Sequence, residues 1–223
     1  LKTDEAKDQK TVVIDDTLYH FVNTGTDAYV LKSADGKLWK KHTLTGFPVN
    51  NDLNDIKYFN GKLYLSKDGD KLYTSTSASN YCSWSVNQIA DYDFSSLLFS
   101  HNNMIWAVVQ SKSDQLYRFA NSTDGATWVI RGEIPAGFPV CDFAAIAFES
   151  RNNRPKVLVA GGYGSDGTLS THRWSSEDGA YWVDFRPAEA FTNRTLDTLD
   201  AGASMIHYDN KLFVIGKYTG NEA

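Results

Sequence analysis

Short apolar runs separated by polar turns recur along the whole chain. A polar turn followed by a run rich in β-forming residues occurs at 15–23, 59–66, 101–109, 154–162 and 209–217. Another apolar run precedes each of these segments, at 11–14, 55–59, 95–99, 144–148 and 203–208, and in four copies a third follows, at 27–32, 71–76, 115–120 and 168–174. Alternating runs bounded by Asn, Asp and Gly are typical of strands joined by tight hairpins. The pattern therefore predicts an all-β chain without an amphipathic helix.

A repeated motif follows the third run of each unit. It reads Ser-x-Asp-Gly with Trp six residues after Ser, and its copies end at Trp39, Trp128 and Trp182. Residues 77–80 form a degraded copy without Asp, which leads to Trp84. The residues around each Trp supply a fourth strand.

Four short strands per unit of about 45 residues are the pattern of a β-propeller blade. We expect four complete blades at 11–46, 52–90, 94–137 and 144–192, the first half of a fifth at 200–223, and a linker at 1–10. A seven-stranded β-sandwich is the alternative, but it would not repeat one motif four times. Because the fifth unit stops after two strands, the remaining blades of a parent protein are an expected partner, with closure through another chain or through residues 1–10 as the alternative.

The repeated turns resemble the Asp-box, or BNR-type, repeat of sialidases and other propellers. The whole chain is similar to Kelch-like propellers and to propeller domains of Bacteroidetes surface lipoproteins. In such a turn Asp accepts backbone N–H bonds, Gly supplies a positive φ and Trp packs between blades. The following residues are therefore expected to be structural: Asp35, Trp39, Trp84, Asp124, Trp128, Asp178 and Trp182. Sialidase activity is not expected, because the arginine triad and the Tyr/Glu pair of that family have no counterpart here. The sequence RGEIP at 131–135 is the nearest match to the family's Arg-Ile-Pro motif, but it does not lie near the start of the chain as that motif does.

The resembled fold places the loops between blades and the loops between second and third strands on one face, around the channel mouth. The candidate binding residues there are Asp52, Asp93, Asp142, Asp200, Tyr163 and Tyr218. The second-to-third-strand loops add Asp27, Asp68, Asp70, Asp114 and Asp166. Two interpretations stay open for these carboxylates. They cap turns, or two of them form the catalytic pair of a glycoside hydrolase.

Composition excludes several other functions. The net charge of −5, from 22 Lys and Arg against 27 Asp and Glu, argues against a nucleic-acid partner. The chain has no run of 18 apolar residues, so no membrane-spanning segment is predicted. The five histidines are dispersed, the acidic string at 67–71 lacks the EF-hand spacing, and Cys82 and Cys141 are interpreted as small buried hydrophobes. No metal, cofactor or catalytic residue is predicted.

The sequence thus favours a non-catalytic interaction or glycan-binding module that uses the loop face to bind a glycan or a protein at the cell surface. The alternatives are a carbohydrate-active hydrolase or lyase that uses the inter-blade carboxylates, and a purely architectural arc. A secreted, periplasmic or outer-surface location is implied by the resemblance alone.

Overall fold

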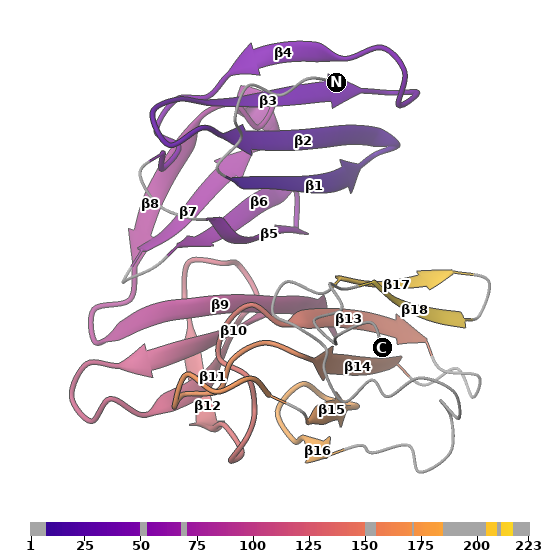
Figure 1. Cartoon of the computed structure of the whole chain (residues 1–223). Coiled ribbons are helices and arrows are strands. Elements are labelled where there is room, and N and C mark those ends of the chain that lie inside the picture. Colours follow the sequence, from indigo (N-terminus) through magenta and orange to yellow (C-terminus); the bar gives the residue numbers. More distant parts are fainter. Residues whose placement is uncertain are drawn as a thin grey trace, which may run out of the picture. The chain divides into compact units, whose positions relative to one another are not determined.

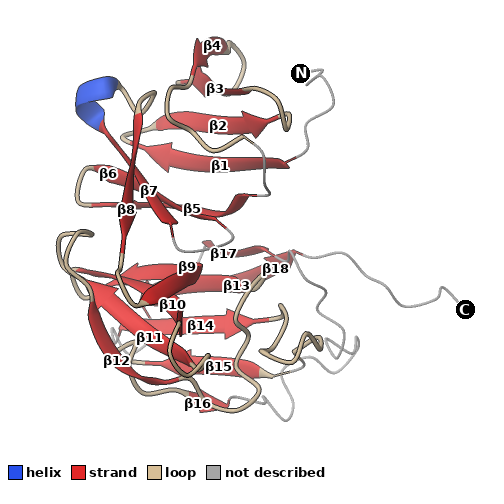
Figure 2. Cartoon of the chain, turned by 90° about the vertical axis from the view of Figure 1, so that its left-hand side faces the viewer, coloured by secondary structure: helices blue, strands red, loops and turns tan. Residues whose placement is uncertain are grey.

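The computed structural model describes residues 8–49, 53–67, 71–149, 155–170, 172–184, 204–208 and 211–215. Within these ranges the chain consists of β-strands and one short 3-10 helix, η1 (Ser77–Ser79). The strands form four-stranded antiparallel sheets in chain order and one two-stranded sheet (Figures 1 and 2). This is the pattern of four blades and half of a fifth that the sequence predicts.

The strands follow the predicted runs closely. The first sheet contains β1 (Asp8–Ile14), β2 (Thr17–Asn23), β3 (Ala28–Ser33) and β4 (Lys40–Thr43). The second contains β5 (Leu53–Phe59), β6 (Lys62–Lys67), β7 (Lys71–Thr76) and β8 (Trp84–Gln88). The third contains β9 (Tyr92–His101), β10 (Met104–Ser111), β11 (Tyr117–Ser122) and β12 (Val129–Glu133). The fourth contains β13 (Ala144–Glu149), β14 (Pro155–Ala160), β15 (Arg173–Ser176) and β16 (Val183–Asp184), and the last sheet pairs β17 (Ser204–Tyr208) with β18 (Lys211–Ile215).

Two boundaries differ from the predicted ones. β1 begins at Asp8, so that residues 8–10, assigned to a linker from the sequence, pair with Asn23, Val22 and Phe21 of β2. The third strand of the fourth sheet begins at Arg173 rather than near residue 168. A tight turn precedes it, in which the Gly164 N–H donates to the Thr168 carbonyl at 2.8 Å.

Contacts along the chain divide it into two compact units, each described here by itself. The first comprises Leu1–Leu97, Val109–Gln115 and Ser122–Trp128, and the second comprises Leu98–Val108, Leu116–Asn121 and Val129–Ala223. The sheet β9–β12 contributes residues to both. In the first unit β1 lies beside β5, and in the second β13 lies beside β17, so the first strands of successive sheets are neighbours.

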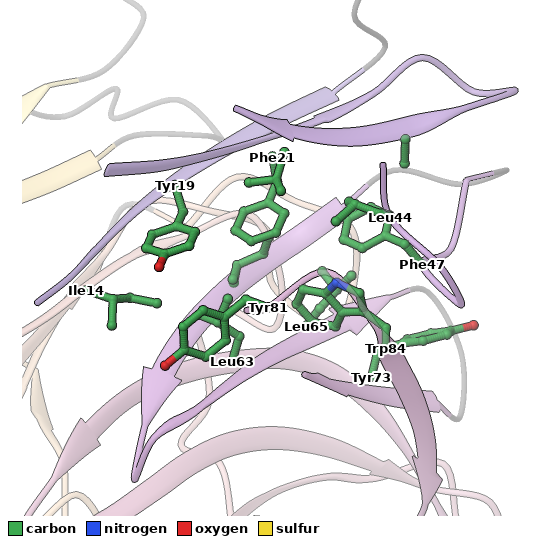
Figure 3. Packing of buried hydrophobic residues seen from close by; sticks show 13 residues of the cluster. Ile14, Tyr19, Phe21, Leu44, Phe47, Leu63, Leu65, Tyr73, Tyr81 and Trp84 are labelled. Carbon is green, nitrogen blue, oxygen red and sulfur yellow. The ribbon is translucent and has the colours of Figure 1, made fainter. Parts of the chain in front are cut away.

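An aromatic cluster fills the core between the first two sheets. The Trp84 ring lies edge-on to Phe21 and Phe47, with ring centroids 5.7 and 5.2 Å apart, and the rings of Phe21 and Phe47 stack (Figure 3). Leu63 and Leu65 of β6 are fully buried in the same cluster. The tryptophan that ends the second turn is therefore wedged against the preceding sheet.

The second unit repeats this packing. Trp182 contacts Phe99, Phe119 and Phe138, all contributed by residues before the fourth sheet, with centroids 5.0 to 5.8 Å apart. Trp84 and Trp182 are 7% and 6% exposed. Trp39 and Trp128 are only half-buried, which is less than the sequence predicts, because their nearest aromatic partners, His20 and Phe94, belong to their own sheets.

This difference in burial gives a test of the core. We expect Trp182→Ala to lower the free energy of unfolding by about 3 to 5 kcal/mol, because it empties a space lined by three phenylalanines. The matched variant Trp39→Ala removes the same side chain from the same motif position and should cost distinctly less. Urea unfolding of both variants measures the difference. Equal losses would contradict the packing described for Trp182.

Candidate functional site

Three turns share one set of hydrogen bonds. We call them the Ser-Asp-Gly turns, at 33–39, 122–128 and 176–182. In the second, Asp124 Oδ1 accepts the N–H groups of Ala126 and Thr127 at 2.8 and 2.7 Å, and Ser122 Oγ accepts the Gly125 N–H at 2.7 Å. Trp128 Nε1 donates to the Gly125 carbonyl at 3.3 Å. The other two turns repeat these bonds. The aspartates thus act inside their own turns, as the sequence predicts.

These bonds lower the pKa of each turn aspartate. For Asp124 the N–H groups of Thr127 and Ala126 are the main causes, and for Asp35 they are those of Leu38 and Lys37. Burial acts in the opposite direction on Asp178, but the N–H groups of Tyr181 and Ala180 still leave its pKa below the ordinary value. The ionised form is therefore the one that holds each turn.

The second sheet carries a different turn. Helix η1 is followed by Asn80 and Tyr81, which both have positive φ, +55° and +59°. The Ser83 N–H donates to Ser79 Oγ at 3.2 Å, in place of an Asp-centred set. Trp84 Nε1 is buried and has no hydrogen-bond acceptor within the described part of the chain, because the glycine carbonyl of the other turns is missing.

The turns of the second, third and fourth sheets each pack on an aromatic residue of the preceding sheet, in each case the third residue of its second strand. A methyl group at Gly125 would overlap the ring of Tyr64 in β6, whose hydroxyl donates to the Asp124 carbonyl at 3.2 Å. A methyl group at Gly179 would lie 2.7 Å from the ring of Trp106 in β10. In the divergent turn, the Tyr81 ring packs edge-on against Tyr19 of β2, with centroids 5.4 Å apart.

On the predicted loop face, the structure brings Asp142 and Tyr163 onto adjoining backbone segments. Tyr163 and Cys141 form an antiparallel bridge, in which the Tyr163 N–H donates to the Cys141 carbonyl at 3.0 Å and the Tyr163 carbonyl accepts the Val140 N–H at 2.7 Å. Asp142 is exposed and has a positive φ of +54°. Its carboxylate forms no hydrogen bond or ion pair within the described ranges. Tyr163 is half-buried.

In the third sheet, too, the loop before the first strand meets the loop between the second and third strands. Asp93, at the start of β9, pairs with Lys112, whose Nζ lies 3.3 Å from Asp93 Oδ1. The Lys112 N–H donates to the Asp91 carbonyl at 3.0 Å. Asp93 is thus neutralised by the neighbouring loop. It belongs to the first unit, and Asp142 and Tyr163 belong to the second.

The other loop carboxylates divide into two groups. Asp27 Oδ1 accepts the Ala28 N–H at 2.8 Å, and Asp166 Oδ1 accepts both the N–H and the hydroxyl of Thr168, at 2.9 and 2.7 Å. Both therefore cap turns. Asp114 also lies in a turn, where its N–H donates to Ser111 Oγ at 3.5 Å. The remaining candidates lie outside the described residues: Asp52, Asp68, Asp70, Asp200 and Tyr218.

Three tyrosines and a lysine, none of them a candidate from the sequence, gather beside the divergent turn. Lys32 Nζ lies 5.0 Å from the centre of the Tyr19 ring and donates to the Asn80 carbonyl. Tyr81 lies between Tyr19 and Tyr58, and Tyr58 is 36% exposed. Burial, with a hydrogen bond to Tyr58, raises the pKa of Tyr81 to about 12. The sequence feature that could have pointed to this group is the degraded turn at 77–80, which lacks Asp and Gly.

Other chemistry is sparse within the described ranges. His172 Nδ1 lies 2.9 Å from Asp184 Oδ2, and the pair joins the outer strands of the fourth sheet. Cys82 and Cys141 are free and half-buried. Among the described residues no three His, Cys, Asp or Glu side chains gather closely enough to hold a metal ion, and none of the helical structure there is long and apolar enough to cross a bilayer.

Comparison with known proteins places the chain in a family. The model of the DUF6242 beta propeller domain matches residues 1–223. The chain belongs to this family. With the sheets described above, this membership confirms the β-propeller fold. No curated protein matches the sequence of this family member.

Several solved structures share the fold. The structure of YjhT is 14% identical, with a TM-score of 0.63 over 95% of this chain and 72% of that chain. An α-L-arabinofuranosidase from Clostridium thermocellum is 14% identical, with a TM-score of 0.53 over 93% and 80% of the two chains. An endo-arabinase from Bacteroides thetaiotaomicron is 14% identical, with a TM-score of 0.51 over 98% and 96%. At these identities the likeness shows a common fold alone.

The lowered pKa values of the turn aspartates give a pH dependence. Because each folded pKa lies below the unfolded value of about 3.9, the ionised aspartates stabilise the fold above that pH, and this stabilisation is lost as the pH falls through the folded values. Thermal unfolding from pH 6 downward should therefore show a steep loss below about pH 4. Asp124→Asn, which keeps an acceptor oxygen but no charge, should flatten the profile, whereas Asp16→Asn in the β1–β2 hairpin should not.

The contact between Gly125 and Tyr64 gives a second test. Gly125→Ala should lower the free energy of unfolding by about 2 to 4 kcal/mol, because the added methyl group meets both a positive φ of +71° and the Tyr64 ring. Gly61→Ala is the matched control, since Gly61 has a φ of +72° but nothing near its Cβ position. It should cost only about 1 to 2 kcal/mol. Denaturant unfolding that finds equal costs would refute docking of the turn on Tyr64.

Proposed function

We propose that this propeller is a non-catalytic glycan-binding module at the cell surface, and that Asp142 and Tyr163 belong to its binding face. The observation that carries the proposal is the exposed Asp142 carboxylate, which has no partner among the described residues. It directly follows Cys141, whose backbone forms a bridge with that of Tyr163. A carboxylate that accepts hydroxyl hydrogen bonds beside a ring that stacks on a sugar face suits a carbohydrate.

The backbone at Asp142 supports the same choice. A non-glycine residue at φ +54° costs free energy unless its surroundings impose it, and such residues cluster at functional sites. Asp15 and Asp16 also have positive φ, but they form the hairpin between β1 and β2, where this conformation is ordinary. Asp142 precedes β13 outside any hairpin.

The other described loop carboxylates support binding rather than hydrolysis. A glycoside hydrolase needs two carboxyl groups about 5 to 9.5 Å apart across an open site. Asp27 and Asp166 are instead occupied by their own turns, and Asp93 by Lys112. The hydrogen bonds shared by the Ser-Asp-Gly turns support the Asp-box resemblance, in which those aspartates are structural.

A glycan array with wild-type protein, followed by calorimetry on the ligands found, tests the proposal. Arabinans belong on the array because two solved structures of this fold are an arabinofuranosidase and an endo-arabinase. Tyr163→Ala should weaken binding by about 10-fold, the equivalent of 1.4 kcal/mol of lost stacking. Tyr181→Ala, which removes an exposed tyrosine from the turn at 176–182, should leave binding unchanged.

Three results would contradict the proposal. Release of soluble sugar from any array ligand would show an enzyme. Equal effects of Tyr163→Ala and Tyr181→Ala would place the binding surface elsewhere. Retained binding in Asp142→Ala would remove the carboxylate from the site.

A further inference from the structure

Two lysines and a histidine crowd one face of the first sheet. Lys32 of β3 and Lys40 of β4 are direct cross-strand partners, and His42 lies two residues beyond Lys40 on the same face. We call these three residues the cationic cluster. Burial lowers the pKa of His42, and the charges of Lys32 and Lys40 lower it further. Both ammonium groups therefore lie close enough to His42 to disfavour its protonated form.

No carboxylate balances the cationic cluster within the described part of the chain. Three lysines elsewhere do have acidic partners: Lys57 pairs with Asp55, Lys112 with Asp93 and Lys156 with Glu177. Like charges directly opposite each other on a sheet are destabilising. An unbalanced cationic cluster in a chain with five more acidic than basic residues thus needs an explanation.

Lys32 is also held in place. Its ammonium donates to the Asn80 carbonyl and lies over the Tyr19 ring. Burial lowers its pKa, and the neighbouring Cys82 acts in the opposite direction. Asp15 acts on Tyr19 and Tyr81, whereas no carboxylate is among the groups that shift the pKa of Lys32 or His42. Contacts that fix a lysine while leaving its charge unbalanced are those of a prepared anion site.

We propose that Lys32, Lys40 and His42 bind an oxyanion, the carboxylate or sulfate group of an acidic glycan. This inference rests on the proposed glycan-binding function and specifies a class of ligand. An ammonium pair supplies charge-assisted hydrogen bonds to a carboxylate or sulfate oxygen. A bound anion would also offset the unfavourable effect of the two lysines on a protonated His42.

The size of the cationic cluster and the charge of the chain favour a glycan over denser polyanions. Three cations match one or two isolated anionic groups. Nucleic acids and anionic membranes present closely spaced charges and are bound by extended basic surfaces. A net charge of −5 repels both. An acidic polysaccharide carries its charges on separate sugar rings, and its neutral parts can contact the tyrosines beside Lys32.

Calorimetry with polygalacturonate, dextran sulfate, neutral dextran and free sulfate tests the inference. Wild-type protein should bind at least one charged polymer about 10-fold more tightly than dextran, the equivalent of 1.4 kcal/mol. Lys32→Gln/Lys40→Gln should lose that preference. The control Lys37→Gln/Lys41→Gln has the same net charge, but Lys41 lies on the opposite face, over the Tyr29 ring, and Lys37 in the turn at 33–39. It should keep the preference, and thermal melts check that both variants fold.

A second measurement uses the wild-type protein alone. Saturation with the charged polymer should raise the pKa of His42 in an NMR titration, because a bound anion favours the protonated imidazole. An unchanged His42 titration overturns the inference, as do equal losses in the two double variants. Binding to anionic lipid vesicles or single-stranded DNA through Lys32 and Lys40, without binding to either charged polysaccharide, also overturns it by naming another occupant.

The two proposals fail in different ways. Binding of neutral glycans without preference for charged ones overturns the anion site and leaves the proposed function standing. Absence of binding to every glycan overturns both. Binding of charged polymers that depends on Lys32 and Lys40 but not on Tyr163 supports the anion site and removes the loop face from the proposed function.

Discussion

The contact between a turn and an aromatic ring of the preceding sheet is the constraint from which much of this structure follows. The ring occupies the third position of the second strand, and glycine lets the turn backbone approach it. Gly125 on Tyr64 and Gly179 on Trp106 are two copies of this contact. In both turns the aspartate accepts two backbone N–H groups and so holds the backbone in one conformation. The hydrogen bonds that lower the pKa of Asp124 therefore also prepare the surface that docks on Tyr64. Phe213 occupies the equivalent position in β18 and is 44% exposed, as expected of such a ring where no described turn covers it.

The divergent second turn shows what happens when the motif is lost. Without Asp and Gly, the segment from Ser77 to Ser83 uses serine hydroxyls and two left-handed residues, and a tyrosine ring takes the place of the glycine contact. The Asn80 carbonyl then becomes available to Lys32. The cationic cluster is thus tied to the turn of the second sheet, where the repeat breaks. Sequence repeats hold a propeller together, and a departure from the repeat leaves room for chemistry that the other blades lack.

The sequence reveals those parts of the fold that depend on local pattern. Strand runs and turns recur with a fixed spacing, so their order and even the hydrogen bonds of Asp35, Asp124 and Asp178 can be predicted from one chain. Burial of the motif tryptophans cannot be predicted in this way, because it depends on the neighbouring sheet. Trp84 packs against Phe21 of the preceding sheet and Phe47, which follows that sheet, whereas the aromatic partner of Trp39 among the described residues is His20 of its own sheet. The pairing of Lys32 with Lys40 depends on strand register, which a shift of one residue would reverse. The ion pair between Asp93 and Lys112 forms only because two loops meet in space. It cannot be predicted from the sequence, in which the two residues lie far apart.

The described charged groups finally separate according to whether the fold already uses them. Asp35, Asp124, Asp166 and Asp178 have lowered pKa values because backbone or hydroxyl donors surround them. These carboxylates accept hydrogen bonds within their own turns, so few of their acceptor positions remain for a ligand. Asp142 lacks such a partner, and no described carboxylate balances the cationic cluster. Both carry a cost, a left-handed backbone in one case and like charges placed together in the other. A folded chain tolerates a local cost of this kind most readily where a ligand relieves it or needs it. That distinction, rather than the abundance of Asp and Lys, separates the residues that build these blades from those proposed to bind.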